Sequence, residues 1–418
     1  MSSSSDVLVI GAGPAGAAAA RALACAGVRV RLLDRQRFPR NKPCGGGITM
    51  RAMSRFPWLG PALPGITTHH VSRLHLEGPS ADSVILASPE PAVLMIRRCE
   101  FDDLLVRLAV EAGAELSEDA WVSQAGADED GVWVRTRDGR EFSARFLVAA
   151  DGVNGVTTRR VGLHQGWDGD GLALDMMEET PNGRLRTAEP GTLWVSYGHA
   201  GTDGYGYIFP KRDYVNVGIG CLLSYFRTHI PLAPYEMQRQ FVDDLRRRGV
   251  LEGDSSREHF TPSHIPVGGP IACTARGRVL AAGDAGGFVN AYTAEGIYYA
   301  MVSGELAGEA IAATLAHPDP AQGQAAARRY VRAWKAEIGG ELRDSVLIQK
   351  YLFRDARRIE AVVKGAAQHR EVADLIIAYA RGTISYAAAR RRILMRFPRV
   401  AVRLARIYLS QRRAASRL

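Results

Sequence analysis

The chain has no apolar run long enough to cross a membrane and too few cysteines to build a disulfide framework. A membrane-spanning helix needs about 20 consecutive apolar residues, and no such stretch occurs among the 418 residues. The five cysteines are odd in number and scattered, which argues against a disulfide scaffold and a zinc site. The serine run at the start has neither a basic nor a separate apolar segment, so we expect no secretory signal. These absences predict a reduced, cytoplasmic protein.

Acidic residues are missing from the C-terminal end. Residues 390–418 contain ten arginines and no Asp or Glu, whereas the whole chain carries a formal net charge of +9. The rest of the chain is therefore close to neutral, and we expect no nucleic-acid partner. The arginines alternate with apolar residues, a pattern that fits either contact with an anionic membrane surface or a solvated helical face packed on the body. The first reading would place the protein peripherally on the inner face of a membrane.

Residues 6–34 have the pattern of a strand, a turn, a helix and a second strand. Residues 6–10, Asp-Val-Leu-Val-Ile, are continuously apolar after Asp6, a pattern typical of a parallel strand covered on both faces. Residues 14–26 are rich in Ala and Leu and predict a helix, with Gly27 as its C-terminal cap. Residues 28–33 predict the next strand. The segment is therefore a βαβ unit.

Later segments add more strands and helices. We predict a helix over 98–112 and strands near 121–123, 132–136 and 142–149. Residues 170–225 mix aromatic and β-branched residues with turn formers and predict an antiparallel sheet. A buried strand at 279–282 precedes a Gly-rich turn and an Ala-rich helix that ends near residue 316. From residue 318 onward the pattern is helical.

A glycine motif joins the first strand to the first helix. Gly11 permits the tight turn, Gly13 lets the backbone approach a pyrophosphate, and Gly16 lets the helix pack closely on the strand. The positive end of the helix favours phosphate. Asp34, at the end of the second strand, is placed to accept hydrogen bonds from a ribose. Ala15 and Arg35 belong to the same candidate cofactor site, and the motif by itself fits either NAD or FAD.

Three later segments resemble signatures of the p-hydroxybenzoate hydroxylase superfamily of flavoproteins. Residues 147–156 resemble its Asp-Gly motif around Asp151, with Gly155 where Ser is usual. Residues 277–287 resemble its second FAD signature, which contains Gly283 and Asp284. Arg98 begins an Arg-x-x-Phe-Asp pattern whose Arg contacts the cofactor in that superfamily. The resemblance implies FAD as the cofactor.

The order of these signals predicts an α/β fold with a discontinuous Rossmann-like FAD-binding domain, an inserted antiparallel-sheet substrate domain and a helical C-terminal region. We expect the FAD-binding domain to comprise residues 1–75, 95–168 and 262–317. The substrate-binding sheet is expected over 76–94 and 169–261, and the helical region with its basic tail over 318–418.

Four further stretches resemble the geranylgeranyl reductase family of FAD-dependent oxidoreductases within that superfamily. They are Lys-Pro-Cys-Gly-Gly-Gly-Ile at 42–48, Gly-Tyr-Gly-Tyr-Ile-Phe-Pro at 204–210, Ile-Pro-Val-Gly-Gly-Pro at 265–270 and the segment 288–301. Tyr207 replaces the usual Trp, and Ala291 and Ala294 replace the more usual Pro and Gly. The resemblance implies reduction of carbon–carbon double bonds in isoprenoid chains of a lipid, quinone or pigment precursor.

The same resemblance supplies candidate site residues. Cys44 is expected beside the flavin, as a proton donor or a group that tunes the ring, the alternative being an inert buried thiol. Tyr205 and Tyr207 are the other catalytic candidates, the alternative being ordinary sheet-core aromatics. The remaining candidates are assigned to cofactor (Gly45, Gly46, Gly296, Ile297) or substrate (Tyr205, Tyr207, Phe209, Pro210, Tyr292). No metal ligand set is expected.

The electron donor leaves no motif of its own. Gly218-Ile-Gly220 continues into Cys-Leu-Leu and fails the dinucleotide pattern. An external reductant, NADPH or reduced ferredoxin, is therefore expected to bind only transiently, and an electron-donor protein is a candidate partner. A flavin monooxygenase or halogenase shares both FAD signatures and is the rival interpretation. A non-catalytic flavin-binding or redox-sensing protein is a third, against which the motifs around Cys44 and Glu295 argue.

Overall fold

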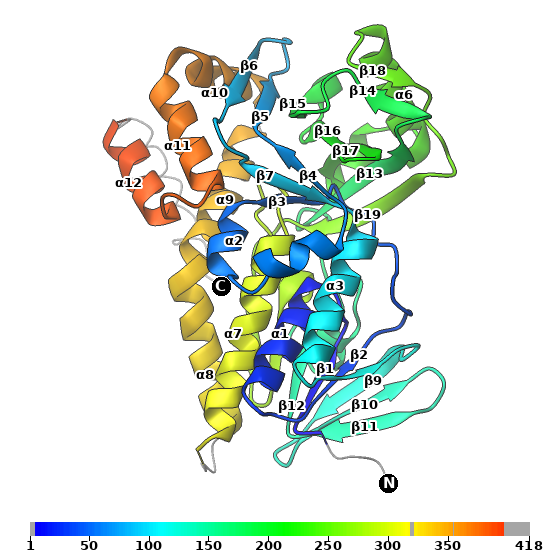
Figure 1. The fold of residues 1–418 in the computed structure, drawn as a ribbon, viewed down its shortest axis with the longest axis vertical. Coiled ribbons are helices and arrows are strands. Elements are labelled where there is room, and N and C mark those ends of the chain that lie inside the picture. Colours follow the sequence, from blue (N-terminus) through cyan, green and yellow to red (C-terminus); the bar gives the residue numbers. More distant parts are fainter. Residues whose placement is uncertain (1–4, 318–321, 354, 397–418) are drawn as a thin grey trace.

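A six-stranded sheet lies at the end of the molecule that holds the N-terminal strand (Figure 1). The computed structural model describes residues 5–317, 322–353 and 355–396. Five strands run parallel and β20 pairs antiparallel at one edge. In spatial order they are β20 (Ala275–Arg276), β21 (Val279–Ala281), β12 (Phe146–Ala149), β1 (Val7–Ile10), β2 (Val30–Leu33) and β8 (Glu115–Ser117). Because these strands come from three separated stretches of chain, the predicted discontinuous Rossmann-like domain is confirmed.

Both faces of this sheet are covered. Val7 and Val9 of β1 pack into a core formed with helices on one side, whereas Leu8 and Ile10 pack into a second core with a small sheet on the other. This burial explains the continuous apolar run of the first strand. The helices are α1 (Pro14–Cys25), α3 (Arg98–Glu111) and α7 (Ile297–Leu315), and the small sheet contains β9 (Val122–Ala127), β10 (Val132–Thr136) and β11 (Glu141–Ala144).

One predicted strand is wrong. Residues 142–149 do not form a single strand, because β11 ends at Ala144 and β12 begins at Phe146. The two segments belong to different sheets on either side of Arg145. Local β propensity continues across this residue, and only the tertiary pairing separates the strands. The second strand of the βαβ unit also begins at Val30, two residues later than predicted.

A seven-stranded, mostly antiparallel sheet forms the other half of the molecule (Figure 1). In spatial order its strands are β19 (Phe260–Pro266), β13 (Leu172–Pro181), β17 (Tyr214–Leu222), β16 (Tyr205–Pro210), β15 (Thr192–Tyr197), β5 (Arg73–Glu77) and β6 (Ser83–Ala87). On one face the side chains pack against α5 (Leu223–His229) and α6 (Pro234–Arg247). The opposite face turns toward the helical region and the FAD-binding fold.

Short elements connect the two large sheets. A three-stranded sheet and helix α2 are formed by chain segments that run between the two halves of the molecule. These elements are β3 (Gly47–Thr49), β7 (Val93–Ile96), β4 (Thr68–Val71) and α2 (Arg51–Arg55), together with α4 (Thr157–Arg160), the 3-10 segments Gly60–Gly65, His199–Gly201 and Gly283–Gly286, and the pair β14 (Leu185–Thr187) and β18 (Leu251–Gly253).

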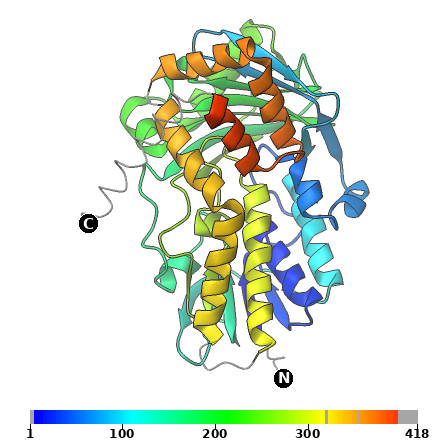
Figure 2. The same ribbon diagram turned by 90° about the vertical axis from the view of Figure 1, so that its left-hand side faces the viewer.

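The C-terminal region is helical as far as it is described. Its helices are α8 (Gln322–Trp334), a π-helical turn (Lys335–Gly339), α9 (Gly340–Leu352), α10 (Ala356–Gln368), α11 (Arg370–Ala380) and α12 (Tyr386–Arg396). Figure 2 shows α7 and α8 running along the parallel-sheet half and the later helices continuing over the antiparallel sheet. Leu352 and Ile359 share a core with Val195 and Tyr207, so these helices cover the second face of that sheet.

Most of the basic tail lies outside the described residues. The structure describes its first part, Arg390–Arg396, as the end of α12, while residues 397–418 fall beyond it. Among the helices that are described, none combines the length and the apolar composition that crossing a bilayer requires.

Candidate active site

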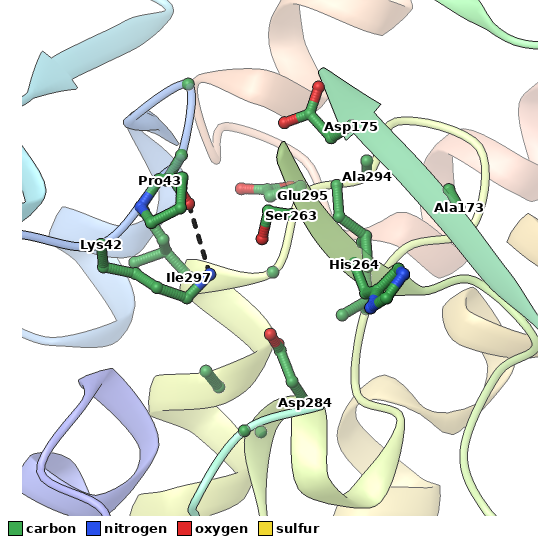
Figure 3. Close-up of a pocket in the computed structure, with 18 of the residues that line it drawn as sticks. Lys42, Pro43, Ala173, Asp175, Ser263, His264, Asp284, Ala294, Glu295 and Ile297 are labelled. Carbon is green, nitrogen blue, oxygen red and sulfur yellow. Dashed lines mark hydrogen bonds between the residues drawn. The ribbon is translucent and has the colours of Figure 1, made fainter. Parts of the chain in front are cut away.

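A cavity of about 620 Å³ lies between the two large sheets and is lined by residues from every part of the fold. It extends from the β1–α1 turn to the inner face of the seven-stranded sheet. Figure 3 places Asp284 on one side of the pocket and Asp175, on strand β13, on the other. Most of the predicted site residues line this cavity: Gly11, Gly13, Ala15, Asp34, Arg35, Cys44, Gly45, Gly46, Arg98, Asp151, Tyr205, Tyr207, Phe209, Gly283, Asp284, Gly296 and Ile297.

Three predicted residues lie outside the lining. Gly16 packs behind the turn, where an added Cβ would lie 1.8 Å from the carbonyl oxygen of Gly11. Pro210 ends β16 as a buried residue. Tyr292 stacks on Tyr197 with ring centroids 5.6 Å apart, and it is Tyr197 that lines the cavity. Gly16 and Tyr292 therefore support lining residues from behind.

The β1–α1 turn leaves the start of α1 open to the cavity. Gly11 has φ +94° and donates its N–H to the carbonyl of Leu33 at 2.7 Å. At Gly13 the nearest protein atom to an added Cβ is a guanidinium nitrogen of Arg40, 3.7 Å away. Pro14 occupies the first turn, and Gly13 makes no side-chain cap. The N-terminal amides of α1 are therefore free of a side-chain cap, as an anion-binding helix start requires.

Asp34 closes the turn at the end of β2. Its buried carboxylate accepts the N–H of Ala12 at 2.8 Å and that of Gln36 at 2.9 Å, and Arg40 lies 3.6 Å away. Arg35 also lines the cavity, and its guanidinium lies 5.5 Å from the ring centroid of Trp121. This end of the cavity can hold a ribose through the carboxylate and a flat aromatic base beside Arg35 and Trp121.

Arg98 is buried at the start of α3. It makes two hydrogen bonds to Asp102, at 2.7 and 2.8 Å, and Asp102 also accepts a bond from Arg40 at 3.1 Å. Burial works against the guanidinium charge, but pairing with Asp102 and the nearby Cys44 keeps the pKa of Arg98 above its ordinary value. Arg98 is thus a fixed positive charge next to the loop that carries Cys44.

Asp151 follows β12 and has one unused oxygen. Its Oδ2 accepts the backbone N–H of Thr157 at 2.9 Å and the hydroxyl of Thr157 at 2.8 Å. Its Oδ1 is buried and has no partner among the described residues, and burial raises the pKa of this carboxyl. An added Cβ at Gly155 would lie 2.2 Å from Cγ of Asp151. The glycine that departs from the superfamily pattern therefore makes room for this orientation of Asp151.

The second FAD signature and the start of α7 form another wall. Asp284 and Gly296 line the cavity, and α7 begins at Ile297 directly after them. Gly296 and Ile297 both line the cavity and no side chain caps this helix start, so the positive end of the α7 dipole lies at the cavity wall. Glu295 is held by the Thr49 hydroxyl at 2.7 Å and by Arg51 at 3.0 Å.

The inner face of the seven-stranded sheet is aromatic and apolar. Tyr205, Tyr207 and Phe209 alternate along β16 and point to this face, with the rings of Tyr207 and Phe209 4.6 Å apart. Cys44 is half-buried, and its sulfur accepts the N–H of Gly46 at 3.4 Å. The apolar wall continues through residues of β5, β7, β15 and the C-terminal helices: Leu74, Leu76, Val93, Leu193, Val195, Phe353, Ile376 and Ala380.

Sequence reasoning missed Asp175. This residue of β13 is 6% exposed, lines the cavity, and places both carboxyl oxygens 3.1 Å from the hydroxyl of Tyr207. Burial raises the pKa of Asp175 to about 7, although the bond from Tyr207 and the charge of Lys42 lower it. The available signal was a single acid within the apolar run Leu-Ala-Leu-Asp-Met-Met. Burying a carboxylate in a strand costs free energy, so such a residue is a candidate for a functional role.

No cluster of three or more His, Cys, Asp or Glu side chains suited to a metal ion occurs in the part of the chain that the structure describes.

Comparison with known proteins agrees with this geometry. Residues 4–337 match the model of an FAD binding domain. The chain is 31% identical to a menaquinone reductase of Mycobacterium tuberculosis, over 73% of this chain and 76% of that one. It is 30% identical to digeranylgeranylglycerophospholipid reductase 1 of Methanopyrus kandleri, over 80% and 86% of the two chains. A geranylgeranyl bacteriochlorophyll reductase-like protein from Thermoplasma acidophilum has the same fold, with a TM-score of 0.78 at 19% identity over 96% of this chain and 98% of that one.

Proposed function

Because the chain belongs to the geranylgeranyl reductase family of FAD-dependent oxidoreductases, we propose that it reduces carbon–carbon double bonds in the isoprenoid chain of a lipid, quinone or pigment precursor. The observation that carries this proposal is the continuity of one cavity from the glycine turn to an apolar sheet face. An isoprenoid chain is flexible and apolar, so it needs a long dry wall rather than polar recognition.

The described residues fit FAD on three observations. The α1 amides are open above Gly13, a buried oxygen of Asp151 lacks a partner, and the uncapped start of α7 faces the cavity. We propose that the Gly11–Gly16 turn holds the pyrophosphate, Asp34 and Arg35 the adenosine end, and Asp284 the ribityl chain. Arg98, Asp151 and the Gly45–Gly46 backbone would hold the remaining parts.

FAD, when bound and reduced, supplies a hydride to one carbon of the double bond. The α7 start at Ile297 favours the negative charge of the reduced ring. Apolar residues such as Leu193 and Val195 exclude water and align the alkene. Because an isolated alkene is a poor hydride acceptor, this alignment and proton delivery by a nearby group must supply much of the rate. We propose that Cys44, Tyr205 and Tyr207 lie at this reacting end.

The reductant for the flavin is proposed to be external and transient, NADPH or reduced ferredoxin, the latter delivered by a partner protein. Since the substrate dissolves in lipid, we also propose that the enzyme works in the cytoplasm against the inner face of a membrane, with the arginine-rich segment from Arg390 in contact with anionic headgroups.

The test of this function is anaerobic. The bound flavin is reduced chemically, then mixed with geranylgeranylated lipids or prenyl quinones, and the products are analysed by mass spectrometry. We expect flavin reoxidation and a gain of two hydrogens for each double bond reduced. The fully saturated analogue of each lipid is the control and should leave the flavin reduced. Oxygen or halogen incorporation in air, with no anaerobic turnover, would instead establish the rival monooxygenase or halogenase.

A further inference from the structure

The hydroxyl of Tyr207 reaches across one strand of the seven-stranded sheet to hydrogen-bond with Asp175. Tyr207 lies on β16 and Asp175 on β13, with β17 between them. Tyr207 pairs with Gly218 of β17, and Asp175 pairs with Gly220. An added Cβ at Gly218 would lie 2.4 Å from both Cζ and the hydroxyl oxygen of Tyr207. The Gly218-Ile-Gly220 segment does not match a nucleotide motif. Because its two glycines have no side chains, the ring of Tyr207 can lie across β17 and reach Asp175.

We propose that Asp175 is the proton reservoir for alkene reduction and that it acts through Tyr207, whose hydroxyl delivers the proton. This inference rests on the proposed function. A protonated Asp175 can donate to the Tyr207 oxygen, which leaves the phenol proton free to point into the cavity. The equal distances of 3.1 Å from the hydroxyl to both carboxyl oxygens allow this exchange without movement of either side chain.

The step balances in atoms and electrons. The π bond of the alkene breaks and two C–H bonds form. One hydrogen arrives with its electron pair as the hydride from the reduced flavin, and the other is the proton of the Tyr207 hydroxyl. The Tyr207 oxygen regains a proton from Asp175, which is left as a carboxylate and takes a new proton from solvent before the next turnover. A carboxyl group that is half-protonated near neutral pH suits both transfers.

Burial raises the pKa of Asp175, and its polar neighbours lower it in part. Besides Tyr207, the titratable groups that interact with Asp175 are Lys42 on the loop before β3 and Tyr205 on β16, and Cys44 interacts with both tyrosines. His264 of β19 lines the same cavity but pairs with Leu174 rather than with Asp175. Lys42 donates to the Pro43 carbonyl at 3.3 Å, and the ring of His264 lies 3.4 Å from the side-chain oxygen of Asn154. The cavity-facing position of β17 next to Asp175 is a glycine and that of β19 is Ser263. Asp175 therefore has Tyr207 as its hydrogen-bonded route toward the reacting end.

The first experiment compares Asp175→Asn with the wild-type holoenzyme. Asn keeps the shape and can accept the bond from Tyr207, but it has no acidic proton to give. The rate at which an isoprenoid alkene reoxidises the reduced flavin should fall by about 100-fold or more at pH 6. The wild-type rate should be constant at low pH and decline by about tenfold per unit above pH 7, because the acid form is lost there. The variant should show no such decline.

The matched control is Glu309→Gln. Glu309 of α7 is also a carboxyl whose pKa is raised, first by burial and then by the charge of Glu305, but it does not belong to the lining of the cavity. Its variant should keep the wild-type rate and alkaline decline. Asp175→Glu should restore part of the rate together with the decline. An Asp175→Asn enzyme with the wild-type rate and pH profile would overturn the proposal.

Infrared spectroscopy provides a reading that needs no substrate. In the difference between the wild-type and Asp175→Asn spectra, the carbonyl stretch of one protonated, buried carboxyl group should appear and should titrate near pH 7. Tyr207→Phe should shift this titration upward, since the bond from Tyr207 lowers the pKa of Asp175. Failure of every alkene to reoxidise wild-type flavin would refute the proposed function alone. Absence of a band that titrates near pH 7 in the wild-type protein would refute the role of Asp175. This outcome holds even if the Asp175→Asn variant does not fold, because it is measured on the wild-type protein.

Discussion

Gly11→Ala should produce a protein that purifies without FAD. Gly11 has φ +94°, a conformation that costs an L-residue about 1–2 kcal/mol, and an added Cβ would lie 2.4 Å from the backbone oxygen of Ala150. Backbone atoms cannot rotate away, so the turn must move from the end of β12 and carry the α1 amides with it. A combined cost of about 3 kcal/mol or more corresponds to an FAD affinity at least about 100-fold weaker.

Flavin absorbance per protein and titration of the apoprotein with FAD measure this effect. Gly27→Ala is the matched control, because Gly27 also has a positive φ, +75°, but an added Cβ there meets nothing within 4 Å. It should lose about 1 kcal/mol of stability and bind FAD normally. If Gly11→Ala retained FAD as well as Gly27→Ala does, the turn would not be the pyrophosphate site.

Arg51→Met should lower the free energy of unfolding by about 3–5 kcal/mol, because it leaves buried carboxylates without their counter-charge. Arg51 of α2 is 7% exposed and bonds to Glu295 at 3.0 Å and to Glu341 at 3.1 Å. It also bonds to Tyr299 at 2.9 Å and to Tyr379 of α11. Burial opposes the charge of Arg51, but these neighbours hold its pKa above the ordinary value.

The consequence should extend to the cavity, because Arg51 ties α9 and α11 to the FAD-binding half, and Tyr379 lines the cavity. Denaturant unfolding of the holoenzyme measures the stability. Arg37→Met is the control: its side chain is 78% exposed and pairs with Asp119 at 2.5 Å, so its loss should leave the stability close to that of the wild-type protein. Equal destabilisation by the two variants would show that the buried ion pairs of Arg51 contribute no more to the free energy of unfolding than an exposed ion pair does.

Much of the FAD-binding half was readable from local sequence. The apolar run at residues 7–10, the Ala-rich helix and the glycine spacing predicted the βαβ unit, because strand burial, helix propensity and turn geometry are decided within a few residues. The order of the later motifs predicted a discontinuous domain, which the strands β12 and β21 confirm by joining β1 in one parallel sheet. From the sequence, Gly155 was only a departure from the superfamily pattern, in which Ser is usual. The structure explains it, because an added Cβ at Gly155 would collide with the side chain of Asp151.

The FAD-binding fold, the family and 17 of the residues that line the cavity could be read from the sequence, since each belongs to a short motif with its own geometry. Which distant groups come together could not be read from the sequence. Asp175 and Tyr207 are 32 positions apart, and Arg51 and Glu341 are 290 apart. No local pattern links such pairs, because strand pairing and helix docking bring them together. The same packing removes water from Asp175, and this burial raises its pKa to about 7.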